Sequence, residues 1–428
     1  MSGPSLGIDL GTSGVRSAVL DAEGAVVAMA RATYGDTPDD RRDPARWWAA
    51  VKDCLAAQME ALRDAGGDPA TITGIAVDGT SGSLVLTDAG LTPVTRALMY
   101  DDGGFEVEAT LIAACAPNPH VARGPASALA RALRLVAEDG AGRAAHLLHQ
   151  ADVITARLMG HGGWTDLNNA LKTGLDPATG RWPDWMASLP LPPRLLPQAV
   201  PPGTPLGRID ATVARRIGLP ASTMIHAGTT DSIAAFLAAT DPVPGAAVTS
   251  LGTTLAVKLH SDHRIDAPEM GLYAHRLGVG WLLGGASNTG GGVLLSLFTP
   301  AELDSLSARI DPRIESPLDY YPLPRAGERF PVNDPTLPPC MLPRPADDTA
   351  FLHGLLESIA RIERRAYQVM AEHGAPWPDR IVTSGGGAAN AAWTAIRARV
   401  LGLPVIAAEM PEAAVGTARL VRLANAAT

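Results

Sequence analysis

The sequence has few cysteines and no excess of positive charge. Its three cysteines, Cys54, Cys115 and Cys340, lie far apart and form no C-x-x-C pair, which argues against a disulfide framework and a zinc site. The formal net charge is −9, so no extended basic field exists to hold a nucleic-acid backbone or an anionic membrane surface. We therefore expect a cytoplasmic protein without nucleic-acid or membrane partners, in which any phosphate is bound locally.

Several familiar signals are also missing. Residues 1–9 have no basic start, no long apolar stretch and no small-residue cleavage site, and the longest apolar runs are strand-sized, so neither a signal peptide nor a membrane span is indicated. The ten histidines form no H-E-x-x-H or other close metal-ligand pair. The G-x-G-x-x-G spacing and the lysine of a Walker loop are absent from the glycine-rich turns, which disfavours those two nucleotide-binding classes.

The length of 428 residues, with 46% hydrophobic and 18% charged residues, predicts a globular protein of two domains. We expect a boundary near residue 225, with an N-terminal domain over 1–225 and a C-terminal domain over 226–428. Strands mixed with helices predict an α/β fold with a cleft between the domains. We expect strands at 6–10, 15–21, 26–31, 72–77, 248–251, 255–260 and 381–383, a hairpin from 83–88, helices from 43, over 351–373 and over 391–401, and a surface loop at 182–205.

Two similar turns are candidate phosphate sites. Asp9-Leu10-Gly11-Thr12-Ser13 follows one predicted strand, and Ser250-Leu251-Gly252-Thr253-Thr254 follows another, which makes an internal duplication plausible. Backbone N–H groups and hydroxyls in such turns are suited to phosphate, and Arg16 adds charge just beyond the first. An ordinary hairpin turn uses the same residues.

A third turn, Ser384-Gly385-Gly386-Gly387-Ala388-Ala389-Asn390, joins a strand to a helix. Three consecutive glycines let the backbone approach a flat ligand or a phosphate without Cβ atoms in the way. Close packing alone is the alternative reason for such a turn.

Asp231 follows Gly228-Thr229-Thr230 and precedes an apolar run, so it lies where a helix begins. That position favours the ionised carboxylate, which is able to accept the proton of an attacking hydroxyl in phosphoryl transfer. A helix N-cap is the alternative role. Three polar clusters, 78–81, 100–102 and 166–169, are suited to a polyhydroxylated ligand, although turns use the same residue types.

With these segments in this order, the chain resembles the FGGY carbohydrate kinases over nearly its whole length. The resemblance implies two ribonuclease-H-like domains of the actin and sugar-kinase type, the first binding sugar and the second nucleotide. It also implies ATP and Mg²⁺ as cofactors. By resemblance, Asp231 is the base and also contacts the substrate, and Asp9 supports Mg²⁺ and the sugar. Thr12 and Ser13 meet the transferred phosphate, Gly11 and Arg16 belong to the same ATP-binding segment, and Gly252 and Thr253 hold the other phosphates. Gly386, Gly387 and Asn390 line the nucleotide pocket with Trp393 nearby. Asp78 and Ser81 face the sugar, although turn geometry decides which of Asp78, Thr80 and Ser81 points inward.

Within the family, the short chain and the runs 74–81, 168–174, 249–259, 284–291 and 320–335 resemble the D-ribulokinase group of cyanobacteria and plants, among the short members similar to xylulose kinases. Larger members acting on xylulose or glycerol usually carry a different segment where this chain has Asp78-Gly79-Thr80-Ser81. We therefore expect phosphorylation of D-ribulose to D-ribulose 5-phosphate by a monomer or homodimer. A kinase for another pentulose or a polyol, such as xylulose or glycerol, and a non-catalytic ATP-dependent sugar sensor remain alternatives.

Overall fold

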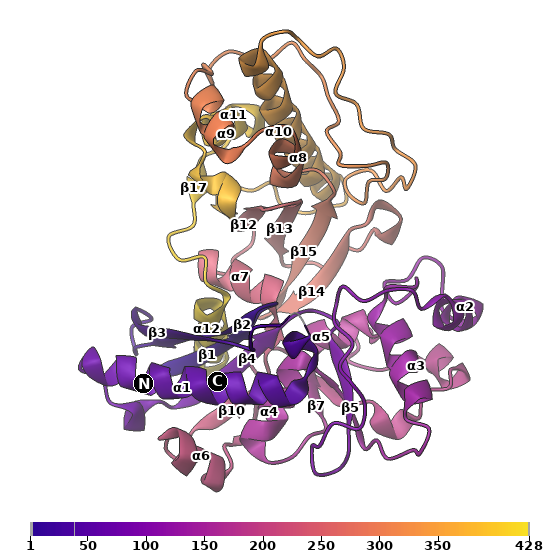
Figure 1. The fold of residues 1–428 in the computed structure, drawn as a ribbon, viewed down its shortest axis with the longest axis vertical. Helices are drawn as coiled ribbons and strands as arrows, with labels where there is room; N and C mark the ends of the chain where they lie inside the picture. The colour runs from indigo at the N-terminus through magenta and orange to yellow at the C-terminus, as the bar shows by residue number, and fades with distance from the viewer. Residues whose placement is uncertain (1–2, 38, 427–428) are drawn as a thin grey trace. The chain divides into compact units, whose positions relative to one another are not determined.

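The computed structural model describes residues 3–37 and 39–426 (Figure 1). The chain forms two compact units: unit 1 comprises residues 1–238 and 412–428, and unit 2 comprises residues 239–411. The sequence alone places one boundary near residue 225 and does not anticipate the return of the chain to unit 1. Among the described residues, no helix is long and apolar enough to cross a membrane.

Unit 1 is built on a mixed sheet. Its strands follow the order β3 (Val26–Thr33), β2 (Gly14–Leu20), β1 (Ser5–Leu10), β4 (Gly74–Gly79), β10 (Met224–His226) and β9 (Pro205–Arg208), and β11 (Thr229–Thr230) also pairs with β4. β1, β2 and β3 are antiparallel neighbours, whereas β4 runs parallel to β1. Every residue of β1 and β4 is buried, as expected for central strands covered on both faces.

Helices cover this sheet. α1 (Pro44–Asp64) begins after its N-cap Asp43, whose side chain accepts a hydrogen bond from the Ala45 N–H at 2.8 Å, and Pro44 occupies the first helical position. α12 (Ala413–Ala426) packs on β1, β2 and β4, although it comes from the far end of the chain. The approach is so close that a Cβ atom at Gly7 would lie 2.0 Å from the Ala414 carbonyl oxygen.

Unit 2 repeats the arrangement. Its sheet has the order β14 (Tyr273–Leu277), β15 (Gly280–Ser287), β13 (Leu255–Ser261), β12 (Ala247–Leu251), β16 (Ile381–Ser384) and β17 (Val405–Ala407). β12, β13 and β15 are antiparallel neighbours and β16 runs parallel to β12, as β4 does to β1. α10 (Asp348–Glu372) and α11 (Ala391–Leu401) supply the long helices. The prediction of a two-domain α/β fold is confirmed, each domain having a mixed sheet.

Further elements complete the units. They are α2 (Glu106–Cys115), α3 (Ala128–Glu138), β5 (Leu84–Thr87), β6 (His146–His149), α4 (Gln150–Met159), β7 (Trp164–Asp166), α5 (Leu167–Lys172), β8 (Gln198–Val200), α6 (Ala211–Ile217), α7 (Asp231–Ala239), α8 (Gly291–Leu297) and α9 (Pro300–Ser307).

Two local predictions need correction. The hairpin predicted from 83–88 is present through the antiparallel bridges Leu84 to Leu98 and Thr87 to Pro93, with the Val94 N–H donating to the Leu86 carbonyl at 2.9 Å. The prediction missed that β5 also forms a ladder with the distant β6. The segment 182–205 is not simply a surface loop. Its apolar side chains are buried in a cluster with residues of α2 and α3, because prolines remove helical periodicity without removing the need to bury leucine. These side chains are Met186, Leu189, Leu191 and Leu195.

Candidate active site

The first predicted phosphate turn connects β1 to β2. The Gly11 N–H donates to the Gly14 carbonyl at 3.0 Å, and the side chains of Thr12 and Ser13 are exposed. Arg16 is the antiparallel partner of Asp9, and its Nη1 lies 3.5 Å from Asp9 Oδ2. The turn therefore presents two hydroxyls beside a carboxylate and a guanidinium.

Asp231 reaches the same place through β11. Thr229 and Thr230 pair with Asp78 and Gly79 of β4, and α7 begins at the next residue. The Asp231 carboxylate accepts a hydrogen bond from the Ser232 N–H at 2.6 Å. Asp231 and the phosphate turn line one cavity of about 400 Å³, whose lining residues are Asp9, Gly11, Thr12, Ser13, Arg16, Asp231, Ser232, Ala235 and Ala413.

Two amides hold the strand that leads to Asp231. Asn168 Nδ2 donates to Thr229 Oγ1 at 3.1 Å, and Asn169 Nδ2 donates to the Thr229 carbonyl at 3.3 Å. Both asparagines are fully buried in α5. The sequence suggested a polyhydroxylated ligand for the cluster at 166–169. In the structure both amides bind Thr229, two residues before the candidate base.

Asp9 and Asp78 are directly opposite each other on β1 and β4. Asp78 is 0% exposed, and the Thr417 hydroxyl of α12 donates to its Oδ2. Burial raises the pKa of Asp78 well above its usual range, and the neighbouring Asp9 raises it further. Burial also raises the pKa of Asp9, while Asp78 and Arg16 oppose that shift. The pair therefore favours carrying a proton.

The residues after Asp78 form a buried polar network rather than an open turn. Ser83 Oγ lies 2.6 Å from Thr80 Oγ1 and accepts a hydrogen bond from the Tyr100 N–H at 3.0 Å. Ser81 Oγ, by contrast, is a buried oxygen without a hydrogen-bond partner among the described residues. Asp78 Oδ1 is a second buried oxygen in 78–81 without such a partner, whereas the Thr80 hydroxyl is bonded to Ser83 and Gln150. Because an unpartnered buried oxygen is costly, Asp78 and Ser81 have oxygens left for a ligand and Thr80 does not.

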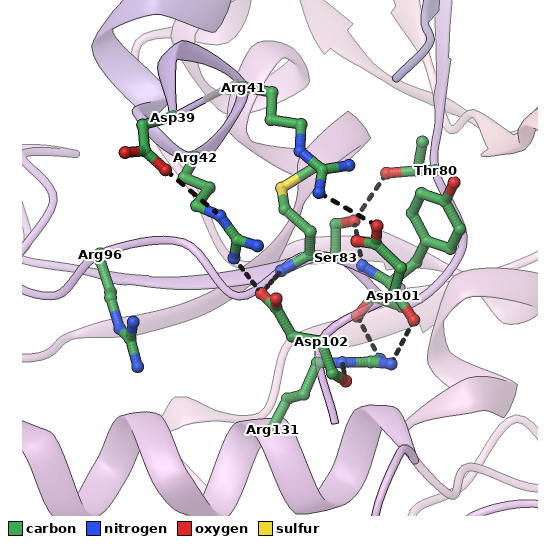
Figure 2. A network of polar contacts seen from close by, with 12 residues as sticks. Asp39, Arg41, Arg42, Thr80, Ser83, Arg96, Asp101, Asp102 and Arg131 are labelled. Atoms are coloured by element: carbon green, nitrogen blue, oxygen red, sulfur yellow. Dashed lines mark hydrogen bonds and ion pairs between the residues drawn. The ribbon is translucent and has the colours of Figure 1, made fainter. Parts of the chain in front are cut away.

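Arginines hold the neighbouring cluster at 100–102 (Figure 2). Asp102 pairs with Arg42, and the half-exposed Asp101 pairs with Arg41 at 3.0 Å. Arg131 is 3% exposed and donates to four backbone carbonyls. These are Gly82, Tyr100 and Asp102 in one segment, and Ala126. The arginines thus fix the shape of this region, and the Asp102 carboxylate is occupied within the protein.

Unit 2 gathers the other predicted nucleotide residues around a cavity of about 440 Å³. Its lining is mostly apolar and consists of Leu251, Gly252, Thr253, Gly291, Leu294, Leu295, Pro300, Leu303, Asp304, Gly386, Gly387, Ala389, Asn390 and Trp393. Ser250 and Ser384 are register partners here, as Asp9 and Asp78 are in unit 1. The duplicated strand ends therefore carry neutral hydroxyls in unit 2 and carboxyls in unit 1.

Asn390 has a structural task in addition to the predicted one. Its Oδ1 accepts from the Trp393 N–H at 2.9 Å, which caps α11, and its Nδ2 donates to Ser307 Oγ at 2.8 Å. Trp393 is almost fully buried, and its indole N–H has no partner among the described residues. The indole N–H is thus a donor still to be satisfied beside the cavity.

Sequence reasoning missed the side of this cavity formed by α8 and α9. Residues Gly291, Leu294, Leu303 and Asp304 line it. The available signal was the glycine run at 290–292, which lies against the second phosphate turn: a Cβ atom at Gly292 would be 2.7 Å from Thr253 Cγ2. The apolar residues of the helices carry no such signal, because they are typical of any packed helix.

The residues of unit 1 fit a nucleotide-bound Mg²⁺ but not a cage made by protein alone. Across residues 3–37 and 39–426, no group of three His, Cys, Asp or Glu side chains is placed to hold a metal ion. Mg²⁺ is commonly held by one or two carboxylates together with phosphates and water. Asp9 supplies one carboxylate at the cavity, whereas Asp78 is enclosed and bonded to Thr417.

Comparisons with known proteins agree with this architecture. Residues 5–121 match the N-terminal domain of the FGGY family of carbohydrate kinases, and residues 247–424 match its C-terminal domain. Xylulose kinase of Streptomyces coelicolor is 31% identical over 265 residues, covering 58% of this chain and 52% of that protein. Xylulose kinase of Streptomyces rubiginosus is 30% identical over 291 residues, covering 61% and 55%. The chain spans about half the length of these relatives. They do not single out the D-ribulokinase group that the sequence motifs indicated.

Solved structures resemble the whole chain. A xyloylose kinase from Brucella ovis superimposes with a TM-score of 0.85 at 26% identity, covering 99% of this chain and 91% of that one. A xylulose kinase from Rhodospirillum rubrum gives 0.84 at 25% identity, covering 99% and 90%. Together with the two domain matches, these similarities show that the chain belongs to the FGGY family of carbohydrate kinases.

Proposed function

We propose that this protein is an ATP-dependent kinase that transfers the γ-phosphate to a terminal hydroxyl of a ketopentose. The observation that carries the proposal is the cavity of unit 1, which Asp231 lines together with Thr12 and Ser13. Phosphoryl transfer requires positioning, charge stabilisation and a group that accepts the hydroxyl proton. All three can be assigned to residues of this cavity.

Each residue has one role in this proposal. Asp231 accepts the proton of the attacking hydroxyl, and Thr12 and Ser13 orient the transferred phosphate. Asp9 holds Mg²⁺, which when bound supplies positive charge to the phosphates. Arg16 adds a second positive charge at the same turn, and Ser81 hydrogen-bonds the sugar.

The cavity of unit 2 binds the nucleoside part of ATP in this proposal. Its apolar walls suit a flat base, and the glycines at 252, 386 and 387 let backbone approach a phosphate. The unpartnered indole N–H of Trp393 is a candidate donor to the nucleotide. The indole belongs to the predicted nucleotide set.

The most specific part of the proposal is the identity of the sugar that accepts the phosphate. The relatives named above are xylulose kinases, so we place xylulose first and D-ribulose, which the sequence motifs favoured, second. A polyol such as glycerol is a third candidate. The distinction depends on hydroxyl stereochemistry, which the hydroxyl and carboxyl groups of unit 1 read by hydrogen bonding.

The experiment mixes purified protein with MgATP and a panel of ketopentoses, aldopentoses, glycerol and hexoses while ADP release is followed. NMR of the product then identifies the phosphorylated hydroxyl. We expect turnover with a ketopentose and its loss in Asp231→Ala with nucleotide binding retained. Turnover with no acceptor would reject the kinase proposal in favour of a sugar sensor, and undiminished turnover in Asp231→Ala would reject the assigned base.

A further inference from the structure

A chain of hydrogen bonds runs through unit 1 from residues 78–83 to the phosphate turn at residues 9–13. We call residues 78–83 the acceptor segment, because Asp78 and Ser81 are the residues predicted to face the sugar. The first half of the chain joins Tyr100, Ser83, Thr80 and Gln150. The Tyr100 N–H donates to Ser83 Oγ at 3.0 Å, and Ser83 Oγ lies 2.6 Å from Thr80 Oγ1, as Figure 2 shows for these two hydroxyls. Thr80 then donates twice to Gln150 Oε1, from Oγ1 at 2.6 Å and from its backbone N–H at 3.0 Å.

The second half of the chain reaches the turn. Gln150 Nε2 lies 3.4 Å from the Tyr34 hydroxyl, which donates to the Gly11 carbonyl at 3.0 Å. Ser83 and Gln150 are fully buried, and Thr80 and Tyr34 are 3% and 4% exposed. Water is therefore excluded from the bonds among Ser83, Thr80 and Gln150, which strengthens them, whereas the end bonds at Tyr100 and Gly11 are partly buried.

The partners fix the direction of every bond in the chain. A backbone N–H only donates, so the atom of Gln150 that faces the Thr80 N–H is its oxygen and the atom that faces Tyr34 is its nitrogen. Since the Thr80 hydroxyl gives its proton to Gln150, the Ser83 hydroxyl gives its own to Thr80. All donors thus point from Tyr100 toward Gly11, the arrangement in which successive bonds polarise one another.

The bond from the Tyr34 hydroxyl to the Gly11 carbonyl sets the direction of the Thr12 N–H, a donor available to a phosphate. In a trans peptide the C=O and the following N–H point in opposite directions. Because Tyr34 draws the Gly11 carbonyl into the protein, the Thr12 N–H is turned the other way. The Tyr34 N–H also donates to the Ser13 carbonyl at 3.4 Å. Burial beside Asp9 and Asp78 raises the pKa of the Tyr34 phenol, which keeps it a donor.

We infer that Tyr34 and Gln150 are positioning residues that lock the phosphate turn to the acceptor segment, so that the geometry of one depends on the other. This inference rests on the proposed function and deepens it. Neither residue touches the reacting atoms in this scheme. When the bond from Tyr34 to the turn is lost, the protein is expected to bind the sugar as before. The turn then places the transferred phosphate less accurately.

The test is Tyr34→Phe, with Tyr320→Phe as its matched control. Tyr320 is also 4% exposed and donates its hydroxyl to a backbone carbonyl, that of Pro343, at 2.6 Å in unit 2. Because displacing a reacting group by about 1 Å can slow a reaction about 100-fold, we expect Tyr34→Phe to lower kcat about 10- to 100-fold. The Kd for the sugar without nucleotide changes by less than about twofold, as does kcat in Tyr320→Phe.

Amide hydrogen exchange tests the same inference without an acceptor. We expect the amides of residues 11–14 to exchange about tenfold faster in Tyr34→Phe than in wild type or Tyr320→Phe. Ser83→Ala opens the chain at its other end, and faster exchange at 11–14 in that variant shows that the chain acts as one unit.

Three outcomes would overturn the inference: unchanged exchange at 11–14 in Tyr34→Phe, an equal loss of kcat in Tyr320→Phe, or a loss of sugar affinity that accounts for the whole effect. A wild-type protein that phosphorylates no acceptor would reject the proposed function alone, because the exchange measurement still decides the role of Tyr34.

Discussion

Thr249 and Thr383 are directly opposite each other on β12 and β16, and one buried ion pair binds both hydroxyls. Thr249 Oγ1 donates to Glu363 at 2.5 Å, and Arg397 Nη1 donates to Thr383 Oγ1 at 2.8 Å. Arg397 and Glu363 also form two bonds with each other, of 2.6 and 2.7 Å. The two turns that line the cavity of unit 2 therefore begin just after a shared polar anchor.

Removing one partner of this anchor is expected to destabilise unit 2. Glu363→Gln leaves the Arg397 guanidinium buried without a counter-ion, which typically costs about 3–5 kcal/mol. The measurement is the free energy of unfolding from urea titrations. The control is Glu372→Gln in the same helix, where the pair with Arg365 is about half exposed and is expected to contribute less than about 1 kcal/mol. Similar losses in both variants would contradict the prediction.

Asp231→Asn separates the two roles that the sequence left open for this residue. Asparagine retains an oxygen that is able to accept the Ser232 N–H, but it is not a base. We therefore expect kcat to fall about 10²- to 10⁴-fold. The melting temperature and nucleotide affinity should match those of wild type. A stability loss that accounts for the lost activity would make Asp231 a structural cap only.

Asp166 predicts a dependence of stability on pH. Burial raises its pKa to about 6, with Asp152 adding to the shift, although Asn169 donates to it. The native state then holds this proton more tightly than the unfolded state, so the contribution of Asp166 is full below about pH 4 and is lost as pH rises to about 6. The loss amounts to about 3 kcal/mol for a pKa of about 6 in place of the ordinary value of 3.8.

The measurement compares unfolding free energies of wild type and Asp166→Asn from pH 4 to 7. Asp9 and Asp78 also have raised pKa values and act in the same direction, so only the difference between the two proteins isolates Asp166. We expect wild type to lose stability relative to the variant as pH rises. A constant difference would contradict the prediction.

Two adjacent glycines predict opposite effects. A Cβ atom at Gly387 would lie 2.7 Å from Leu251 Cβ and 3.0 Å from Trp393, whereas one at Gly386 meets nothing within 4 Å. Gly387→Ala should therefore strain the packing by about 1–3 kcal/mol and lower the melting temperature by several degrees. Gly386→Ala should leave the melting temperature unchanged. It should weaken ADP binding several-fold, because the added methyl group enters the cavity of unit 2. Calorimetry and nucleotide titration of both variants check the contrast, and the reverse pattern would contradict it.

The sequence predicted the strands and turns of the site well because local chemistry determines them. Asp9-Leu10-Gly11-Thr12-Ser13 needs only a strand end and a turn, and Asp231 needs only a helix start. Partners that depend on distant packing were not predictable. Nothing in the sequence around Gln150 or Tyr34 indicates that they meet, since they are 116 positions apart and belong together only after the sheet has formed.

The same limit explains the corrections. β5 pairs with β6, about 60 residues away, in addition to its local bridges, and the sequence near β5 does not indicate this second partner. Leucines of 182–205 have no periodic pattern, yet the neighbouring α2 and α3 bury them. The resemblance to the FGGY family is confirmed by the two domain matches, but it indicated D-ribulose, whereas the matched relatives are xylulose kinases. Hydroxyl stereochemistry is read by side-chain orientations that a motif does not encode.

α12 has a consequence for how the protein is made. Unit 2 is one continuous stretch, so it is able to fold as soon as residue 411 leaves the ribosome. Unit 1 is different, because the faces of β1 and β4 that pack on α12 stay uncovered until residues 413–426 have been synthesised. The hydrogen bond from the Thr417 hydroxyl to Asp78 is also unable to form before then. The candidate catalytic unit begins first during translation and is completed last.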